Sequence, residues 1–141
     1  MRMTDRGQMT VEFAVALPVM IVVAVIAVNA LSFFSDCAAF DNLFRDAVRA
    51  QATAPAYGQD AEWGRGAVES QLAAAFPRRN EAVAVERSAA AEGHDRFTAT
   101  LTYRPTLFGL GMRTSVLGVP IPPLSHRASM VVDCYKPGVV V

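Results

Sequence analysis

The chain has 141 residues and a formal net charge of zero, and 52% of its residues are hydrophobic. Proteins that bind nucleic acid usually carry a basic face, so this charge balance argues against a nucleic-acid partner. A chain of this length can fold into one small domain with a modest core, which leaves little room for an enzyme cleft with a lid.

A long uncharged segment follows a short polar N-terminus. Phe13 to Ser35 contains no formally charged residue, and Glu12 stands at its entrance. A helix of this length reaches roughly 35 Å, which is enough to cross the hydrocarbon core of a bilayer, about 30 Å thick. Arg2 and Arg6 precede the segment, so the positive-inside rule predicts a cytoplasmic N-terminus, with the rest of the chain on the other side.

The pattern predicts one helix from Val11 to about Thr53, apolar all round in its first half and amphipathic in its second. Pro18 lies inside this helix and favours a kink, which membrane helices tolerate better than soluble ones. Apolar residues of the second half recur every three or four positions and form one face. These residues are Phe33, Cys37, Phe40, Phe44 and Val48.

A second helix is predicted to begin after Asp60, which is a good N-cap, and to end at Phe76, before Pro77. Its buried side is expected to contain Val68, Leu72, Ala75 and Phe76. Trp63 is also expected to lie in the core.

The remainder of the chain has strand patterns. Strands are predicted over residues 82–87, 96–103 and 125–135, and the middle one alternates apolar residues with threonines. Residues 106–123 contain too many glycines and prolines for a regular element, yet they are strongly apolar. The sequence therefore predicts an α+β fold with a long N-terminal membrane-spanning helix, a second helix and a three-stranded antiparallel sheet.

The string Gly7-Gln8-Met9-Thr10-Val11-Glu12-Phe13, which runs directly into the apolar segment, resembles the class III signal of type IV pilins. Together with the following residues up to Pro18, it is similar to the TadE-like minor pseudopilins of tight-adherence (Tad/Flp) systems. Residues 41–50 resemble the helix that those proteins carry just outside the membrane.

This resemblance implies a pilin-like fold and cleavage by a prepilin peptidase between Gly7 and Gln8. It also implies that Glu12 and Phe13 act in assembly, with other pilins and pseudopilins and an inner-membrane assembly platform as partners. The expected organisation is a cytoplasmic leader over residues 1–7, a transmembrane helix over 8–35 and an extracytoplasmic α+β domain over 36–141. The protein would then be a single-pass component of the bacterial cytoplasmic membrane that takes part in pilus assembly.

Two alternatives stay open at this point. Val28-Asn29-Ala30 satisfies the small-residue rule of ordinary signal peptidase, so the chain could instead be a secreted domain cut after Ala30. It could also be an uncut single-pass membrane accessory protein.

The two cysteines, Cys37 and Cys134, both fall on apolar faces of their predicted elements, and in an exported domain they are expected to form a disulfide. The alternative is a pair of buried thiols, and two lone cysteines do not complete a zinc shell. Ser125, His126 and Asp133 are triad residue types, but neighbouring residues of a strand point to opposite faces. We therefore expect no catalytic site, no metal and no cofactor.

Overall fold

The computed structural model describes residues 5–52, 58, 60–91, 93–111 and 115–133. Its elements in chain order are α1 (Asp5–Gln51), α2 (Ala61–Ala75), β1 (Glu81–Ala91), β2 (His94–Tyr103), β3 (Ser115–Val116), β4 (Val119–Pro120) and β5 (Leu124–Asp133). The predicted α+β class is confirmed, with a long apolar N-terminal helix, a second helix and a three-stranded antiparallel sheet.

The larger sheet has the strand order β1-β2-β5, and both pairs are antiparallel. Each of the three strands extends somewhat beyond its predicted bounds on at least one side. Side chains of the central strand β2 alternate between the two faces, and the inward-facing ones are buried as predicted. They are Phe97, Ala99, Leu101 and Tyr103. The threonines between them are half-buried and not fully exposed, because β2 has a neighbouring strand on each side.

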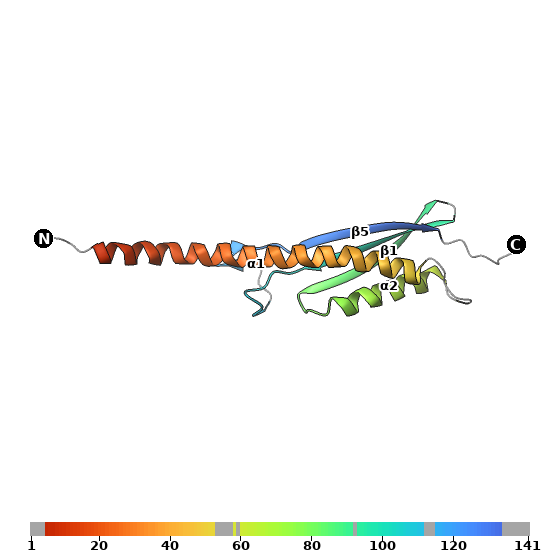
Figure 1. Ribbon diagram of the computed structural model, residues 1–141, viewed down its shortest axis with the longest axis horizontal. Coiled ribbons are helices and arrows are strands. Elements are labelled where there is room, and N and C mark those ends of the chain that lie inside the picture. Colours follow the sequence, from red (N-terminus) through yellow and green to blue (C-terminus); the bar gives the residue numbers. More distant parts are fainter. Residues whose placement is uncertain (1–4, 53–57, 59, 92, 112–114, 134–141) are drawn as a thin grey trace.

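One face of this sheet is covered by the C-terminal half of α1 and by α2 (Figure 1). The ring of Phe40 lies at the centre of this layer, with its centroid 5.6 Å from that of Phe76. Burial of a Phe, Leu or Val side chain contributes about 1.5–3 kcal/mol, so this layer supplies most of the hydrophobic stabilisation. Its largest fully buried members are Phe40, Phe44, Val48, Val68, Leu72, Phe97 and Leu101.

The second helix begins and ends close to where the sequence predicts. The carboxylate of Asp60 accepts a hydrogen bond from the backbone N–H of Trp63 at 2.8 Å, which satisfies a donor in the first turn. The buried side of α2 repeats every four residues, over Gly64, Val68, Leu72 and Phe76. Trp63 and Ala75 are exposed, so their predicted burial was wrong: each precedes a member of this stripe by one residue, about 100° around the helix.

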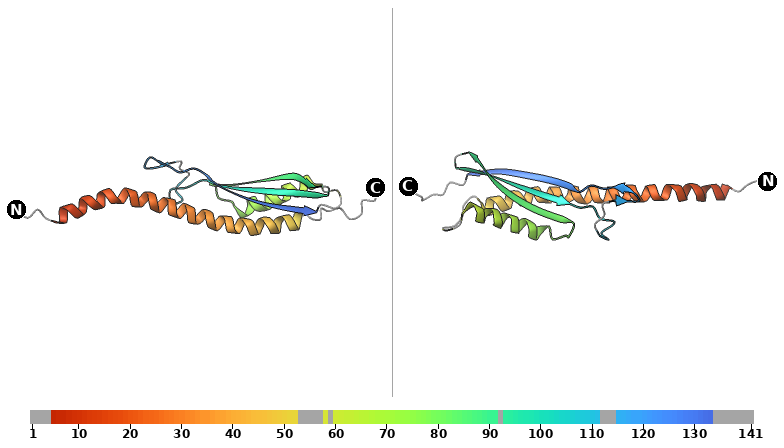
Figure 2. Two further views of the ribbon diagram at one scale, coloured as in Figure 1. Left: turned by 90° about the horizontal axis from the view of Figure 1, so that it is seen from above. Right: turned by 180° about the vertical axis from the view of Figure 1, so that it is seen from behind.

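The first helix is longer than the domain that packs on it. Its N-terminal part extends beyond the sheet, so that the molecule is elongated (Figure 1). Pro18 lies inside α1, and the helix curves along its length, as the left-hand view of Figure 2 shows. A proline removes one helical hydrogen bond and clashes with the preceding turn, which accounts for a bend in this part of the chain.

The segment from 106 to 123 contains a small hairpin, which the sequence did not predict. Its strands β3 and β4 are joined by Leu117 and Gly118, whose φ angles are 49° and 83°. Positive φ at both positions is typical of the tight turn that joins two-residue hairpins. The glycines and prolines therefore do not prevent strand pairing here, because the turn itself uses one of the glycines.

Candidate functional site

The N-terminal half of α1 exposes apolar side chains on all sides. Every residue from Met9 to Ile21 is exposed, and this strongly apolar part of the helix is almost unburied within the fold. A core helix of a soluble protein would bury such residues, whereas a membrane anchor presents them to lipid. By length and composition α1 could cross a membrane, and a signal sequence has the same properties.

Glu12 and Phe13 both lie on this exposed surface. Glu12 borders a shallow groove along α1 that is otherwise apolar, between Val11, Val15 and Val19. A carboxylate in apolar surroundings is costly without a partner, so this position suits contact with a cation or an amino group. The backbone of the predicted cleavage site, residues 7–8, belongs to the start of α1. The predicted roles of Gly7, Gln8, Glu12 and Phe13 stay predictions.

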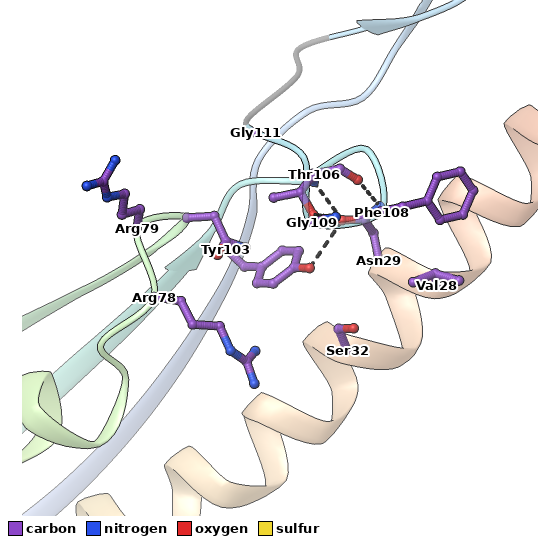
Figure 3. A pocket seen from close by; sticks show the side chains of 11 residues that line it. Val28, Asn29, Ser32, Arg78, Arg79, Tyr103, Thr106, Phe108, Gly109 and Gly111 are labelled. Atoms are coloured by element: carbon purple, nitrogen blue, oxygen red, sulfur yellow. Dashed lines mark hydrogen bonds between the residues drawn. The ribbon is translucent and has the colours of Figure 1, made fainter.

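Asn29 joins the middle of α1 to the loop after β2. Its side chain is buried, and its Nδ2 donates hydrogen bonds to the carbonyl oxygens of Val25 and Thr106, both at 2.8 Å. Its Oδ1 accepts from the backbone N–H of Thr106 at 2.8 Å and from the hydroxyl of Tyr103 at 3.1 Å (Figure 3). An amide side chain has two donor hydrogens and two acceptor positions, so all four are used. The folded domain therefore begins inside the apolar segment of α1, where Val25 is buried as well.

A pocket of about 640 Å³ lies beside this junction, between α1 and the loop after β2. It is lined by apolar side chains such as Val28 and Phe108 and by the polar stretch Arg78-Arg79-Asn80. Figure 3 shows Arg78 directed toward α1 and Arg79 directed away from it. Among the described residues that line it there is no carboxylate, histidine or cysteine, so its chemistry suits an anionic or apolar contact.

Arg78 connects the end of the α2 region to α1. Its guanidinium lies 3.1 Å from the carboxylate of Asp36 and 2.8 Å from that of Glu81. These two carboxylates raise the pKa of Arg78. Burial raises the pKa of Glu81, whose side chain is only 1% exposed; Asp36 adds to this rise and Arg78 opposes it. The cluster is a structural ion-pair network that holds β1 against α1.

Cys37 is half-buried on α1. Burial raises the pKa of its thiol, with further contributions from Asp41 and Asp36, so the thiol stays protonated at neutral pH. Cys134 lies outside the described residues, and its predicted bond to Cys37 stays a prediction. The direction of β5 affects how close the chain beyond this strand can come to Cys37. His126 Nε2 lies 2.8 Å from the Oδ1 of Asp41, one turn beyond Cys37, and β5 then runs alongside α1 away from Cys37 (Figure 2).

The triad residue types of β5 do not come together. His126 contacts Asp41 and packs edge-on against the ring of Phe40, whereas Ser125 is exposed and Asp133 ends the same strand. Among residues that the structure describes, no group of three or more His, Cys, Asp or Glu side chains could hold a metal ion.

Comparison of the chain with protein-family models finds no match, and comparisons with curated proteins and with solved structures find none either. The features of the chain that bear on function are therefore the signal-like motif and the geometry of α1.

The junction at Asn29 was not predicted from the sequence. A signal for it was present, because Asn29 is the one amide in an apolar segment whose other polar residues are serines. A polar residue at such a position needs a partner and marks a site of interaction. The identity of that partner, Thr106, depends on how the later loop folds and is not visible in the local pattern.

Proposed function

We propose that the chain is a TadE-like minor pseudopilin, anchored in the bacterial cytoplasmic membrane by α1, that takes part in assembly of a Tad/Flp-type pilus. The observation that carries this proposal is that α1 has an exposed apolar part and a part packed against the sheet. One continuous helix exposes apolar side chains from Met9 to Ile21 and packs against a small sheet from Phe40 to Val48. A signal-like motif, with Gly7 and Glu12, stands at the exposed end.

In this function a prepilin peptidase cuts between Gly7 and Gln8 on the cytoplasmic side. The new α-amino group is then close to Glu12, the fifth residue of the mature chain, in the same or a neighbouring subunit. Breaking such a pair in apolar surroundings leaves an uncompensated charge, so the contact would fix the stagger between helices. Partners are the prepilin peptidase, other pilins and pseudopilins, and the inner-membrane assembly platform.

The junction at Asn29 supports this proposal over a secreted domain cut after Ala30. Such a cut would remove Asn29 and leave the buried hydroxyl of Tyr103 and the backbone groups of Thr106 without their partner. It would also remove Val25, which is 1% exposed in the fold. The domain therefore uses a part of α1 that ordinary signal peptidase would discard.

The test is intact mass and N-terminal peptide mapping of the full chain, isolated from membranes of cells with and without the prepilin peptidase. The expected mature chain begins at Gln8, only when the peptidase is present, and Gly7→Leu abolishes this product. Gly66→Leu is the matched control, because Gly66 faces open space on α2. A chain that begins at Met1 despite the peptidase, or at Leu31, would contradict the proposal in favour of an uncut anchor or a secreted domain, respectively.

A further inference from the structure

Two bulky apolar side chains occupy turn positions that favour other residues. Phe108 and Leu117 both have φ of 49°, in the left-handed region, and both are more than half exposed. Glycine, asparagine or aspartate adopts this conformation at lower steric cost. Phe108 borders the pocket beside Val28 but stays 54% exposed, and Leu117 is 66% exposed, so packing within the domain accounts for them only in part.

These residues belong to a set of exposed apolar side chains in two neighbouring segments of the chain, which we call the apolar tip. It consists of Phe108 and Leu110 in the loop after β2 and of Leu117 and Val119 in the β3–β4 hairpin. Monomeric soluble proteins rarely gather such side chains at loop tips without a partner.

The apolar tip lies at the end of the domain from which the exposed half of α1 emerges. Two hydrogen bonds between Asn29 and the backbone of Thr106 hold the start of this loop against α1. Both views of Figure 2 show the hairpin displaced from the three-stranded sheet toward the N-terminal half of α1. Trp63, by contrast, lies near the other end of the packed region, since the next residue, Gly64, packs against Gln51 and Ala52. The apolar tip and the exposed helix thus form two parts of one end of the molecule.

Charge at this end fits the surface of a membrane. Arg79 is exposed and lines the pocket of Figure 3. Arg104 is exposed too, and its backbone N–H donates to the carbonyl of Asn80, the residue after Arg79, at 2.7 Å. The sequence contains no acidic residue between Asp95 and Asp133, which includes the whole apolar tip. Basic side chains above an apolar surface are typical of segments that lie in the lipid interface, where they meet phosphate groups.

We infer that the apolar tip inserts into the outer leaflet of the bilayer through which α1 passes, with Arg79 and Arg104 at the level of the lipid phosphates. The inference rests on the proposed membrane anchor and adds a second contact with lipid. The domain is then held at a fixed height and orientation on the membrane, since α1 and the apolar tip enter it side by side.

The single tryptophan of the chain allows a direct test. The full chain is reconstituted in phosphatidylcholine–phosphatidylglycerol vesicles whose acyl chains carry bromine, which quenches tryptophan at short range. In a Trp63→Phe background, Phe108→Trp and Leu117→Trp are each compared with Val15→Trp, on the exposed half of α1. The unmodified chain, with Trp63 alone, is the control for the distant end of the domain.

We expect the Phe108→Trp and Leu117→Trp variants to be quenched about as strongly as Val15→Trp, and the unmodified chain to be unaffected. Quenching of Val15→Trp alone would overturn the inference and leave the membrane anchor intact; the apolar tip would then be free for a protein partner. Absence of quenching in all three variants would overturn both the anchor and the inference.

A further variant separates lipid contact from a structural role of the hairpin. Asparagine suits the turn position of Leu117 better than leucine does, so Leu117→Asn should leave the thermal unfolding midpoint unchanged or raise it. It should nevertheless reduce the quenching of Phe108→Trp in the same chain. A lowered midpoint together with undiminished quenching would show that Leu117 serves the fold and would overturn its part in the inference.

Discussion

Asn29 occupies the point at which α1 changes from an exposed helix to a packed one. Its amide is buried, and each of its donor and acceptor positions has a partner within the chain. A buried amide whose hydrogen bonds are all formed is compatible with a stable fold. The same buried groups without hydrogen-bond partners would carry the full cost of desolvation. The loop that bears the apolar tip therefore depends on one side chain of α1 for its position.

Replacing Asn29 with leucine should destabilise the fold. The hydroxyl of Tyr103 and both backbone groups of Thr106 would lose their partner, and we expect the free energy of unfolding to fall by about 1–3 kcal/mol. Chemical denaturation of the full chain in detergent measures this change. Asn42→Leu, at an exposed asparagine of the same helix, is the matched control and should have little effect. Equal stability of the two variants would contradict the assignment of the junction.

Glu81 should make stability depend on pH in the acid range. Burial raises the pKa of its carboxyl in the folded state, so the folded protein holds this proton more tightly than the unfolded chain does. The contribution of Glu81 is therefore most favourable below its unfolded pKa of about 4.3 and is lost as pH rises through the raised folded value. The unfolding free energy of the wild type minus that of Glu81→Gln should accordingly decrease as pH rises from about 4.

Denaturation of the full chain in detergent at a series of pH values measures that difference. Glu86→Gln removes an exposed carboxylate from the same strand and is the matched control for the loss of one charge. A difference between wild type and Glu81→Gln that is constant over the series would contradict the direction of the pKa change.

At the scale of elements, the contact between α1 and α2 depends on two glycines with different surroundings. A Cβ at Gly64 would lie 3.4 Å from the carbonyl oxygen of Gln51, whereas a Cβ at Gly66 would meet nothing within 4 Å. The first glycine permits close approach of the two helices, and the second has no such role. Each also reduces the helix propensity of α2, by about 1 kcal/mol relative to alanine.

Substitutions at these glycines should therefore differ in sign. Gly66→Ala is expected to raise the free energy of unfolding by about 0.5–1 kcal/mol, because only the propensity changes. Gly64→Val is expected to lower it by about 1–3 kcal/mol, since its branched side chain forces the helices apart. Gly66→Val provides the control for the lower propensity of valine. If Gly64→Val and Gly66→Val had the same free energy of unfolding, this would contradict the role of Gly64 in the close contact between the two helices.

Elements with strong local signals were predictable from the sequence. The alternation of β2 and the cap at Asp60 depend on neighbouring residues alone, and both are confirmed. The exposure of Trp63 was not predictable in this way, because the position of the buried stripe depends on where α1 passes. The junction between Asn29 and Thr106 spans 77 positions of sequence and depends on the path of an irregular loop. Of the candidate site, the exposed surface around Glu12 could therefore be anticipated and the junction could not.

For the whole molecule, the length of the exposed part of α1 matters. The fold covers α1 from Val25 onward, which leaves residues 9–24 fully or largely exposed. Sixteen helical residues span roughly 24 Å, somewhat less than a bilayer core of about 30 Å. If the apolar tip enters the outer leaflet beside α1, the region around Val25 and Asn29 also lies at membrane depth. The satisfied amide of Asn29 is then required, because an unpaired polar group at that depth is costly.

Glu12 is the one charged residue between Arg6 and Asp36, so it should control how mature chains associate. Under the proposed function, Glu12→Gln should be cleaved after Gly7 at the wild-type level, because the cleavage site is unchanged. Its association with other subunits should be weaker, since the amino group of Gln8 loses its counter-charge. Breaking a buried ion pair costs about 3–5 kcal/mol, and 1.4 kcal/mol corresponds to tenfold in affinity, so the affinity between subunits should fall about a hundredfold or more and the fibre-associated fraction should fall with it.

The measurement is the ratio of mature chain in the sheared surface fraction to that in the membrane fraction, determined by quantitative immunoblot. If the chain acts only in the membrane, the second measurement is the ratio of mature chain that co-purifies with the assembly platform to mature chain in the whole membrane fraction. Glu86→Gln, in the exposed part of β1, removes the same charge far from the helix and should leave both ratios unchanged. Normal ratios for Glu12→Gln would mean that its carboxylate stays hydrated at the membrane surface. Packing of the apolar helices would then have to set the stagger between subunits without help from a charge pair.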